Sequence, residues 1–159
     1  TWDNVALAVQ AQAGHSFHFW KDARKDPLLR EPALVFLEQV GLAERADIVA
    51  GQLSHGEHRQ LEIAMALATR PKMLLLDEPM AGMGPEESKA MVAILQGLKR
   101  KLTILLIEHD MKMVMDISER ILVINFGKPI MEGNPEEVQK NPEVLKAYLG
   151  EDEGIADAA

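Results

Sequence analysis

The sequence predicts an α/β fold in which parallel core strands are flanked by helices and attached to a helical subdomain. Residues 73–76 and 102–107 are almost wholly apolar runs that end in polar residues, as expected of short strands buried on both faces of a parallel sheet. A helical pattern over 86–98 separates these runs, which suggests a β-α-β unit. Before residue 71 helices are predicted and no strand.

Three helices are expected in the first third of the chain. Residues 1–12 carry an apolar face and end before Gly14, and a second helix is expected to begin at Glu31-Pro32 because proline suits a first turn. The third helix, 58–70, follows Ser54 and Glu57, which have the spacing of a capping box.

The segment 15–30 is predicted to be a connection with an apolar anchor, since three aromatic residues cluster at 17–20 and charged residues follow. His15 and His18 resemble a metal-binding pair, but they have no third ligand nearby, so a structural role is favoured.

Polar side chains end both predicted strands. Asp77 and Glu78 follow the first strand, and His109 comes just after the second. Because parallel strands joined by a helix end at the same edge of a sheet, we expect these side chains to share that edge. The acidic pair suggests metal and water chemistry, although a simple polar turn would leave the same pattern.

The C-terminal third reads as a mixture of short elements. We expect a helix over 111–117, a hairpin of strands 121–125 and 129–132 around a turn at 127–128, and two helices that each begin with Asn-Pro. The acidic tail after Gly150 is predicted to be disordered.

Composition narrows the functional classes. The 159 residues suffice for one substantial core, and a net charge of −8 with a pI near 5.1 argues against nucleic-acid binding. The absence of cysteine from the sequence removes disulfides and thiol catalysis and fits a reducing compartment. No apolar run is long enough to span a bilayer, so any membrane connection would run through a partner.

The segment around Ser54 permits two interpretations. Ser54 and Glu57 could serve only to cap the following helix. Alternatively, a helix N-terminus with a serine hydroxyl and a glycine, Gly56, that allows close approach of the backbone is a natural cradle for phosphate.

Three segments in this order resemble motifs of ABC-transporter ATPases, which have a P-loop NTPase fold. Residues 53–60 resemble the signature motif, 73–79 the Walker B motif and 107–110 the segment with the switch histidine. Details at 60–64, 81–82 and 148–151 resemble the branched-chain amino acid uptake subfamily. The resemblance implies a helical subdomain with the signature motif and its helix (1–70), a catalytic sheet portion (71–133), and C-terminal helices with an acidic tail (134–159).

The resemblance also implies roles for individual residues and the cofactors ATP and Mg²⁺. Asp77 would hold Mg²⁺, Glu78 would act as general base on the attacking water, and His109 would contact the γ-phosphate. Ser54 and Gly56, with Glu57 beside them, would bind the ATP held by the opposite subunit of a dimer.

The sequence departs from the family pattern in three ways. It contains no G-x-x-x-x-G-K-[ST] loop, which the family places upstream, so we expect a C-terminal portion that is inactive by itself. His55 and Glu57 stand where many relatives carry glycine and glutamine. Gly84 stands where many relatives carry aspartate, which puts signalling between subunits through that position in doubt.

The resemblance implies an ATP-hydrolysing subunit that energises import of branched-chain or related amino acids. Its partners would be a second, identical or different ATPase subunit, transmembrane permease subunits and, indirectly, a substrate-binding protein, at the cytoplasmic face of the inner membrane. The alternatives are a non-catalytic dimerisation or interaction module and an ABC ATPase for urea or amide uptake. An ATPase of this superfamily acting on nucleic acid or ribosomes is disfavoured by the acidic charge balance.

Overall fold

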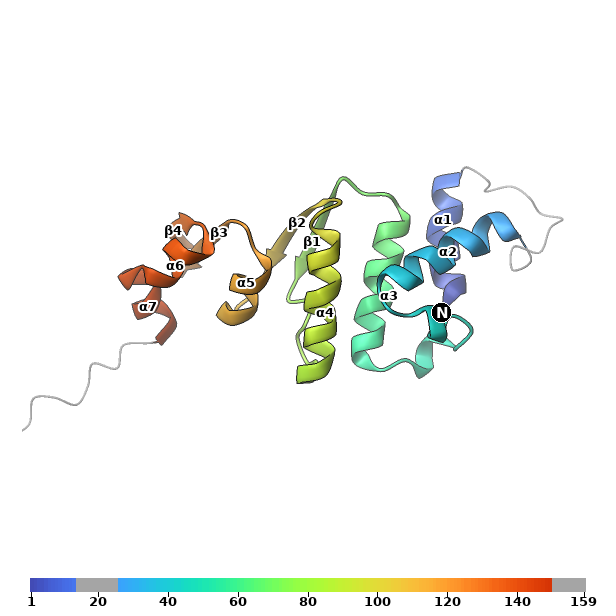
Figure 1. Ribbon diagram of the computed structural model, residues 1–159, viewed down its shortest axis with the longest axis horizontal. Coiled ribbons are helices and arrows are strands. Elements are labelled where there is room, and N and C mark those ends of the chain that lie inside the picture. Colours follow the sequence, from blue (N-terminus) through green and yellow to red (C-terminus); the bar gives the residue numbers. More distant parts are fainter. Residues whose placement is uncertain (14–25, 150–159) are drawn as a thin grey trace, which may run out of the picture. The chain divides into compact units, whose positions relative to one another are not determined.

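The computed structural model describes residues 1–13 and 26–149, and the chain folds as two compact units, Thr1–Glu108 and His109–Ala159 (Figure 1). The predicted aromatic anchor, the pair His15 and His18, and the acidic tail lie outside the described residues. Within the described residues, no helix is both long and apolar enough to cross a membrane.

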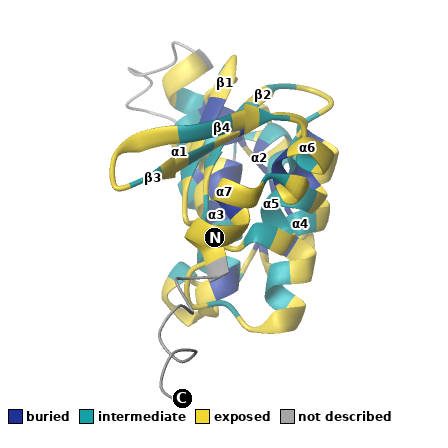
Figure 2. Ribbon diagram, turned by 90° about the vertical axis from the view of Figure 1, so that its left-hand side faces the viewer, coloured by how far each residue is buried: buried dark blue, intermediate teal, exposed yellow. Residues whose placement is uncertain are grey.

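Three helices build the core of the first unit. They are α1 (Trp2–Ala13), α2 (Pro27–Gln39) and α3 (His55–Ala68), and the 3-10 turns η2 (Ala43–Arg45) and η3 (Ala50–Gln52) lie between α2 and α3. Their inward faces bury apolar side chains completely, including Val5, Ala33, Leu37 and Ala64. Buried stretches of the chain are dark blue in Figure 2. The predicted helical subdomain therefore has a closed core.

The predicted start of α2 at Glu31-Pro32 is wrong. The helix begins at Pro27, and the side chain of Asp26 accepts a hydrogen bond from the Leu28 N–H at 3.0 Å, while Pro32 lies inside the helix. Asp26-Pro27 combines an N-cap carboxylate with a proline at the first helical position, which makes it the stronger of the two start signals.

A parallel pair of strands completes the first unit. Strand β1 (Met73–Asp77) leads through α4 (Pro85–Leu98) to β2 (Thr103–Ile107), and the register pairs Met73 with Thr103 and Asp77 with Ile107. The predicted parallel β-α-β unit is confirmed, and the two strands end level with each other.

The prediction that β1 is buried on both faces is wrong for the described chain. Leu74 is 5% exposed, but its neighbour Leu75 is 68% exposed, and on β2 the side chains of Leu105 and Ile107 are 51% and 58% exposed. Burial therefore alternates along both strands, because the other elements of the first unit cover only one face of this two-stranded sheet.

The second unit is small and mixed. Helix α5 (Met111–Ile117) precedes an antiparallel hairpin of β3 (Ile121–Asn125) and β4 (Lys128–Gly133), followed by α6 (Pro135–Lys140) and α7 (Pro142–Leu149). Ile121, Val138 and Val144 form its buried cluster. The predicted hairpin is confirmed, although its turn lies one residue earlier, at Phe126-Gly127, where both φ angles are positive.

The two predicted Asn-Pro helix starts in this unit are also confirmed. Asn134 accepts from the Glu137 N–H at 3.0 Å and the Glu137 side chain accepts from the Asn134 N–H, also at 3.0 Å. Asn141 accepts from Glu143 N–H at 2.8 Å and from Val144 N–H at 3.2 Å. These side chains satisfy first-turn N–H groups that have no partner inside the helix.

Candidate functional site

The N-terminus of α3 is fixed by the predicted capping box. Ser54 Oγ accepts a hydrogen bond from the Glu57 N–H at 3.2 Å, and Glu57 Oε2 accepts one from the Ser54 N–H at 2.8 Å. Ser54 is exposed, whereas Gly56 in the first turn is buried. The serine hydroxyl therefore stands at the positive end of a fourteen-residue helix, where anions are favoured.

Glu57 also joins this helix to the turn η2. Its Oε1 accepts from Arg45 Nε at 2.8 Å, so one carboxylate holds both the cap and an ion pair. The hydrogen bond from the Ser54 backbone, with Arg45 as a further contributor, holds the pKa of the Glu57 carboxyl below its usual value. Glu57 is thereby kept ionised as a structural anion beside Ser54.

A second carboxylate, Glu87 of α4, reaches the same serine. Ser54 Oγ donates to Glu87 Oε1 at 3.0 Å, and Glu87 Oε2 accepts from the Gly84 N–H at 3.2 Å. A Cβ atom added to Gly56 would lie 2.7 Å from both Cδ and Oε1 of Glu87. Sequence reasoning missed Glu87; the one available signal was a glutamate three residues after the glycine that begins a helix.

His55 makes a third link between α3 and the loop before α4. Its Nε2 lies 3.0 Å from the Ala81 carbonyl oxygen, which accepts a hydrogen bond from the Nε2–H tautomer of the ring. The neighbouring Gly82 has φ +77°, a left-handed conformation that glycine adopts without strain, and a Cβ there would lie 3.5 Å from the ring. His55 thus packs on this loop.

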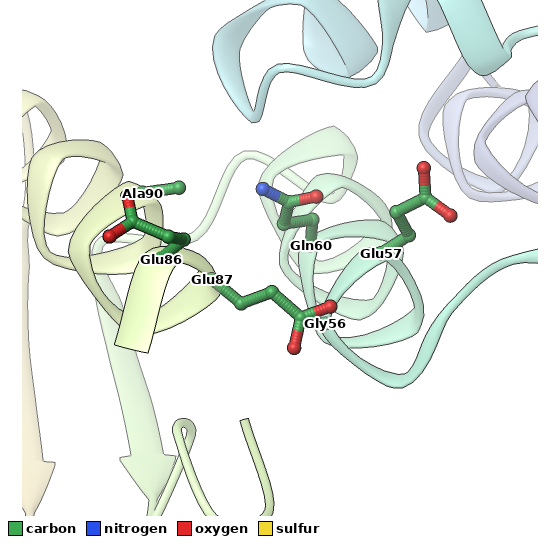
Figure 3. A pocket seen from close by; sticks show the side chains of 6 residues that line it. All are labelled: Gly56, Glu57, Gln60, Glu86, Glu87 and Ala90. Atoms are coloured by element: carbon green, nitrogen blue, oxygen red, sulfur yellow. The ribbon is translucent and has the colours of Figure 1, made fainter. Parts of the chain in front are cut away.

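An open cleft of about 260 Å³ lies between α3 and α4. Figure 3 shows the Glu87 side chain extending toward Gly56, whereas the carboxylate of Glu57 points away from α4. The lining residues are Gly56, Glu57 and Gln60 of α3 with Glu86, Glu87 and Ala90 of α4. The cleft is thus acidic on its α4 side.

Asp77 and Glu78 lie where β1 ends, as predicted. Both are exposed, and the Glu78 N–H donates to the carbonyl of Ile107, the last residue of β2, at 2.9 Å. Glu78 has φ +43°, a left-handed conformation that costs free energy for a residue with a side chain. Such strain persists only where the surrounding structure enforces it, and it is common at functional sites.

The predicted site residues fall into two units. Ser54, Gly56, Glu57, Asp77 and Glu78 belong to the first, and the loop after Glu78 contacts the signature helix through the Ala81 carbonyl. His109 begins the second unit, directly before Asp110, whose side chain caps α5 by accepting from the Met113 N–H at 3.2 Å.

The donors at the end of β1 suit a hard cation that is bound mainly through other oxygens. Among residues 1–13 and 26–149, no group of three or more His, Cys, Asp or Glu side chains could hold a metal ion. Mg²⁺ is typically held by one or two carboxylates together with the phosphates of a nucleotide. A single exposed strand-end carboxylate, Asp77, fits that pattern, and the Ser54 hydroxyl at the start of α3 is a donor of the kind that binds a phosphate oxygen.

Two family models match the chain. The model described as "ABC transporter" matches residues 3–81, and the model described as "Branched-chain amino acid ATP-binding cassette transporter" matches residues 128–154. The first match contains the helical core, the signature segment and the Walker B strand. The second contains β4, α6 and α7.

Curated relatives agree with these matches. The chain is 50% identical over 123 residues to the high-affinity branched-chain amino acid transport ATP-binding protein BraF of Pseudomonas aeruginosa, covering 76% of this chain and 48% of that protein. Against LivG of Salmonella typhimurium and of Escherichia coli K12, proteins with the same description, the identities are 50% and 49% over 121 residues, each covering 75% of this chain and 48% of the relative. The alignments thus span about half the length of these relatives.

Solved structures confirm the predicted fold class. The ADP conformation of an ATP-binding cassette of an ABC transporter is 31% identical with a TM-score of 0.74, covering 93% of this chain and 62% of that chain. A nucleotide-free ATP-binding cassette is 30% identical with a TM-score of 0.72 at the same coverages.

Proposed function

Because this chain belongs to the ABC transporter family of ATP-binding proteins, we propose that it is the C-terminal portion of an ATP-hydrolysing subunit that energises import of branched-chain or related amino acids. The observation that carries this proposal is the backbone of Glu78, which has a strained φ of +43° directly after the parallel strand β1 and whose N–H donates to the Ile107 carbonyl at the end of β2. A carboxylate carried by such a backbone at the carboxyl edge of a parallel sheet is suited to orient water as a general base.

The remaining roles are those that the resemblance to the family implies. Asp77 would hold Mg²⁺ beside the phosphates, and bound Mg²⁺-ATP would supply the phosphoryl group that water attacks. Ser54 and Gly56 would contact the γ-phosphate of a nucleotide held by the partner subunit, and their position at the positive end of α3 supports a contact with phosphate. His109 would contact the γ-phosphate in its own subunit. Glu57 would act through Ser54, whose backbone it holds.

The uncovered face of the β1–β2 sheet supports a dependence on further polypeptide. Leu75, Leu105 and Ile107 expose apolar surface side by side on neighbouring strands, where packing against another segment would be favourable. We infer that this face packs on polypeptide outside residues 1–159, which would also supply the phosphate-binding loop. The 159 residues alone would then neither bind nor hydrolyse ATP.

The proposed partners are a second ATPase subunit, the permease subunits and, through them, a substrate-binding protein. The chain would lie at the cytoplasmic face of the membrane by contact with the permeases. The names of BraF and LivG support the choice of branched-chain amino acids. Substrate choice would be decided by partner proteins.

A chimaera tests the proposed chemistry. The N-terminal part of BraF, up to the point where the alignment begins, is joined to residues 1–159, and Mg²⁺-dependent ATP hydrolysis is measured. We expect hydrolysis that falls by a factor of about 10² to 10⁴ in the Glu78→Gln variant, because a general base contributes roughly that much. Glu86→Gln, an exposed carboxylate on the first turn of α4, is the matched control and should retain activity.

Binding of a fluorescent ATP analogue shows whether each chimaera has a formed site. A chimaera that binds the analogue and hydrolyses ATP equally well with and without Glu78 would contradict the assignment of the general base. Tight Mg²⁺-dependent ATP binding by residues 1–159 alone would contradict the proposed need for a separate phosphate loop.

A further inference from the structure

We propose that Glu87 is an intramolecular latch on the signature segment: its carboxylate occupies the anion position beside Ser54 and Gly56, and an incoming phosphate group must displace it. The proposal rests on the proposed function for the role of Ser54 in phosphate binding. The contact itself is a property of the described chain.

The Glu87 carboxylate lies beside the first turn of α3, next to Ser54 and Gly56. It takes the hydroxyl proton of Ser54 at 3.0 Å, which is the hydrogen bond that a phosphate oxygen at this position would need. The Ser54 hydroxyl carries a single proton, which can serve only one acceptor at a time. Its oxygen is itself engaged, because it accepts from the Glu57 N–H. Glu87 and a phosphate group therefore compete for the same donor.

Gly56 provides the room for this contact. A methyl group at position 56 would lie 2.7 Å from the carboxylate carbon and Oε1 of Glu87, closer than nonbonded carbon atoms approach. The space that a glycine leaves for close approach to the backbone is thus filled by the side chain of Glu87, as Figure 3 shows. Two anions in that space would also repel each other.

The latch connects the signature segment to the loop that follows Glu78. The second carboxylate oxygen of Glu87 accepts from the Gly84 N–H, and His55 Nε2 donates to the Ala81 carbonyl. The Ala81 N–H in turn donates to the Glu78 carbonyl at 3.1 Å. Displacing Glu87 from Ser54 would break the link that runs from α3 through Glu87 to Gly84 of this loop. Binding of phosphate at Ser54 would in this way change the contacts of the loop that follows the proposed general base.

Glu86 provides a matched comparison on the same turn of α4. It also lines the cleft, but its carboxylate pairs with Lys89 at 2.8 Å, and both side chains are largely exposed. Changing Glu86→Gln removes the same charge from the same cleft without altering the contact to Ser54. It therefore separates a general charge effect from the latch.

The experiment titrates the 159-residue chain with inorganic phosphate and follows the backbone amide NMR signals of residues 54–57. Glu87→Gln should lower the dissociation constant at these amides by about tenfold relative to the unchanged chain, because a competing charge within hydrogen-bonding distance is removed. Glu86→Gln should shift it by less than about twofold, as expected of an exposed charge that is screened by salt. Without phosphate, the NMR signals of the Ser54 and Gly84 amides should also differ between the Glu87→Gln chain and the unchanged chain.

Three outcomes decide between the possibilities. The latch would be overturned if the unchanged and Glu87→Gln chains bound phosphate with equal affinity. If Ser54→Ala then abolished phosphate binding, the phosphate role of Ser54 would stay intact. Equal gains from Glu86→Gln and Glu87→Gln would overturn it in favour of a general charge effect. No binding at these amides in any variant would overturn the latch and also count against the signature assignment, whereas failure of the chimaera's hydrolysis alone would not affect it.

Discussion

The helical part of the first unit and its two-stranded sheet solve the burial of apolar residues in different ways. Helices α1, α2 and α3 surround side chains with no exposed surface, such as Val5, Leu37 and Val40. The sheet buries Leu74 but leaves Leu75 and Leu105 more than half exposed, although both strands are rich in apolar residues. The helices thus enclose a fully buried core while exposing other apolar residues such as Leu7 and Leu28, whereas no side chain of the two strands is fully buried.

This difference shows which part of the chain is structurally self-sufficient. The helical core obtains the full hydrophobic contribution from its own residues, at roughly 25 cal/mol for each Å² removed from water. The open face of the sheet can gain that contribution only from another segment. The chemistry proposed at the end of β1 therefore lies on the less complete of the two regions.

The largest expected effect separates these regions directly. Leu37→Ala should lower the free energy of unfolding by about 2 to 5 kcal/mol, because it removes buried methyl groups and leaves a cavity. Leu75→Ala removes the same atoms from a side chain that is 68% exposed and should cost less than about 1 kcal/mol. Urea denaturation of both variants measures the difference. Equal losses would mean that the face bearing Leu75 is covered in solution.

The cap of α3, the helix that leads into the sheet, should give an intermediate effect. Ser54→Ala is expected to cost about 1 kcal/mol, because the Glu57 N–H loses its acceptor. Ser88→Ala, within α4, is the control and should be neutral or stabilising, since alanine favours a helix interior. The same denaturation experiment measures both, and a cost at Ser88 equal to that at Ser54 would contradict the capping role.

Much of the framework was predictable because local signals and tertiary structure agree. The apolar runs, the capping box at Ser54 and the Asn-Pro starts at 134 and 141 each depend on neighbours within four residues, and all of them form as expected. The start of α2 was misplaced because the proline at 32 was taken for the first turn, although Asp26-Pro27 adds an N-cap carboxylate to the same proline signal.

The candidate site was predictable only in part. The strand-end position of Asp77 and Glu78 follows from chain order, but the hydrogen bond between Ser54 and Glu87 joins residues 33 positions apart and follows no local pattern. The positive φ of Glu78 was equally hidden, because residue type argues against it. The exposed face of β1 was missed since a continuous apolar run does not reveal what covers it.

A smaller, pH-dependent effect should come from Glu57. Its pKa is lowered in the folded chain, so the folded state binds this proton less tightly than the unfolded state does. Its contribution to stability should be complete above about pH 4.3, the usual glutamate value, and be lost as the pH falls below it. The stability difference between the unchanged chain and Glu57→Gln should therefore shrink in acid. Glu62→Gln, which removes an exposed carboxylate of the same helix, is the control. If the stability difference caused by Glu57→Gln grew in acid, the lowered pKa of Glu57 would be contradicted.

The smallest expected effect concerns the ion pair that ties η2 to the cap. Arg45 and Glu57 are 53% and 21% exposed, and such pairs contribute only about 0.2 to 1 kcal/mol. Arg45→Gln should therefore lower the free energy of unfolding by less than Ser54→Ala, and high salt should reduce the loss further because exposed charges are screened. A double-mutant cycle with Glu57→Gln isolates the pair, since removing Arg45 should have no effect once its partner is neutral. If Arg45→Gln lowered the free energy of unfolding just as much in the Glu57→Gln chain, Arg45 would stabilise the turn η2 through its aliphatic stem. The link between η2 and the cap of α3 would then depend on packing and not on charge.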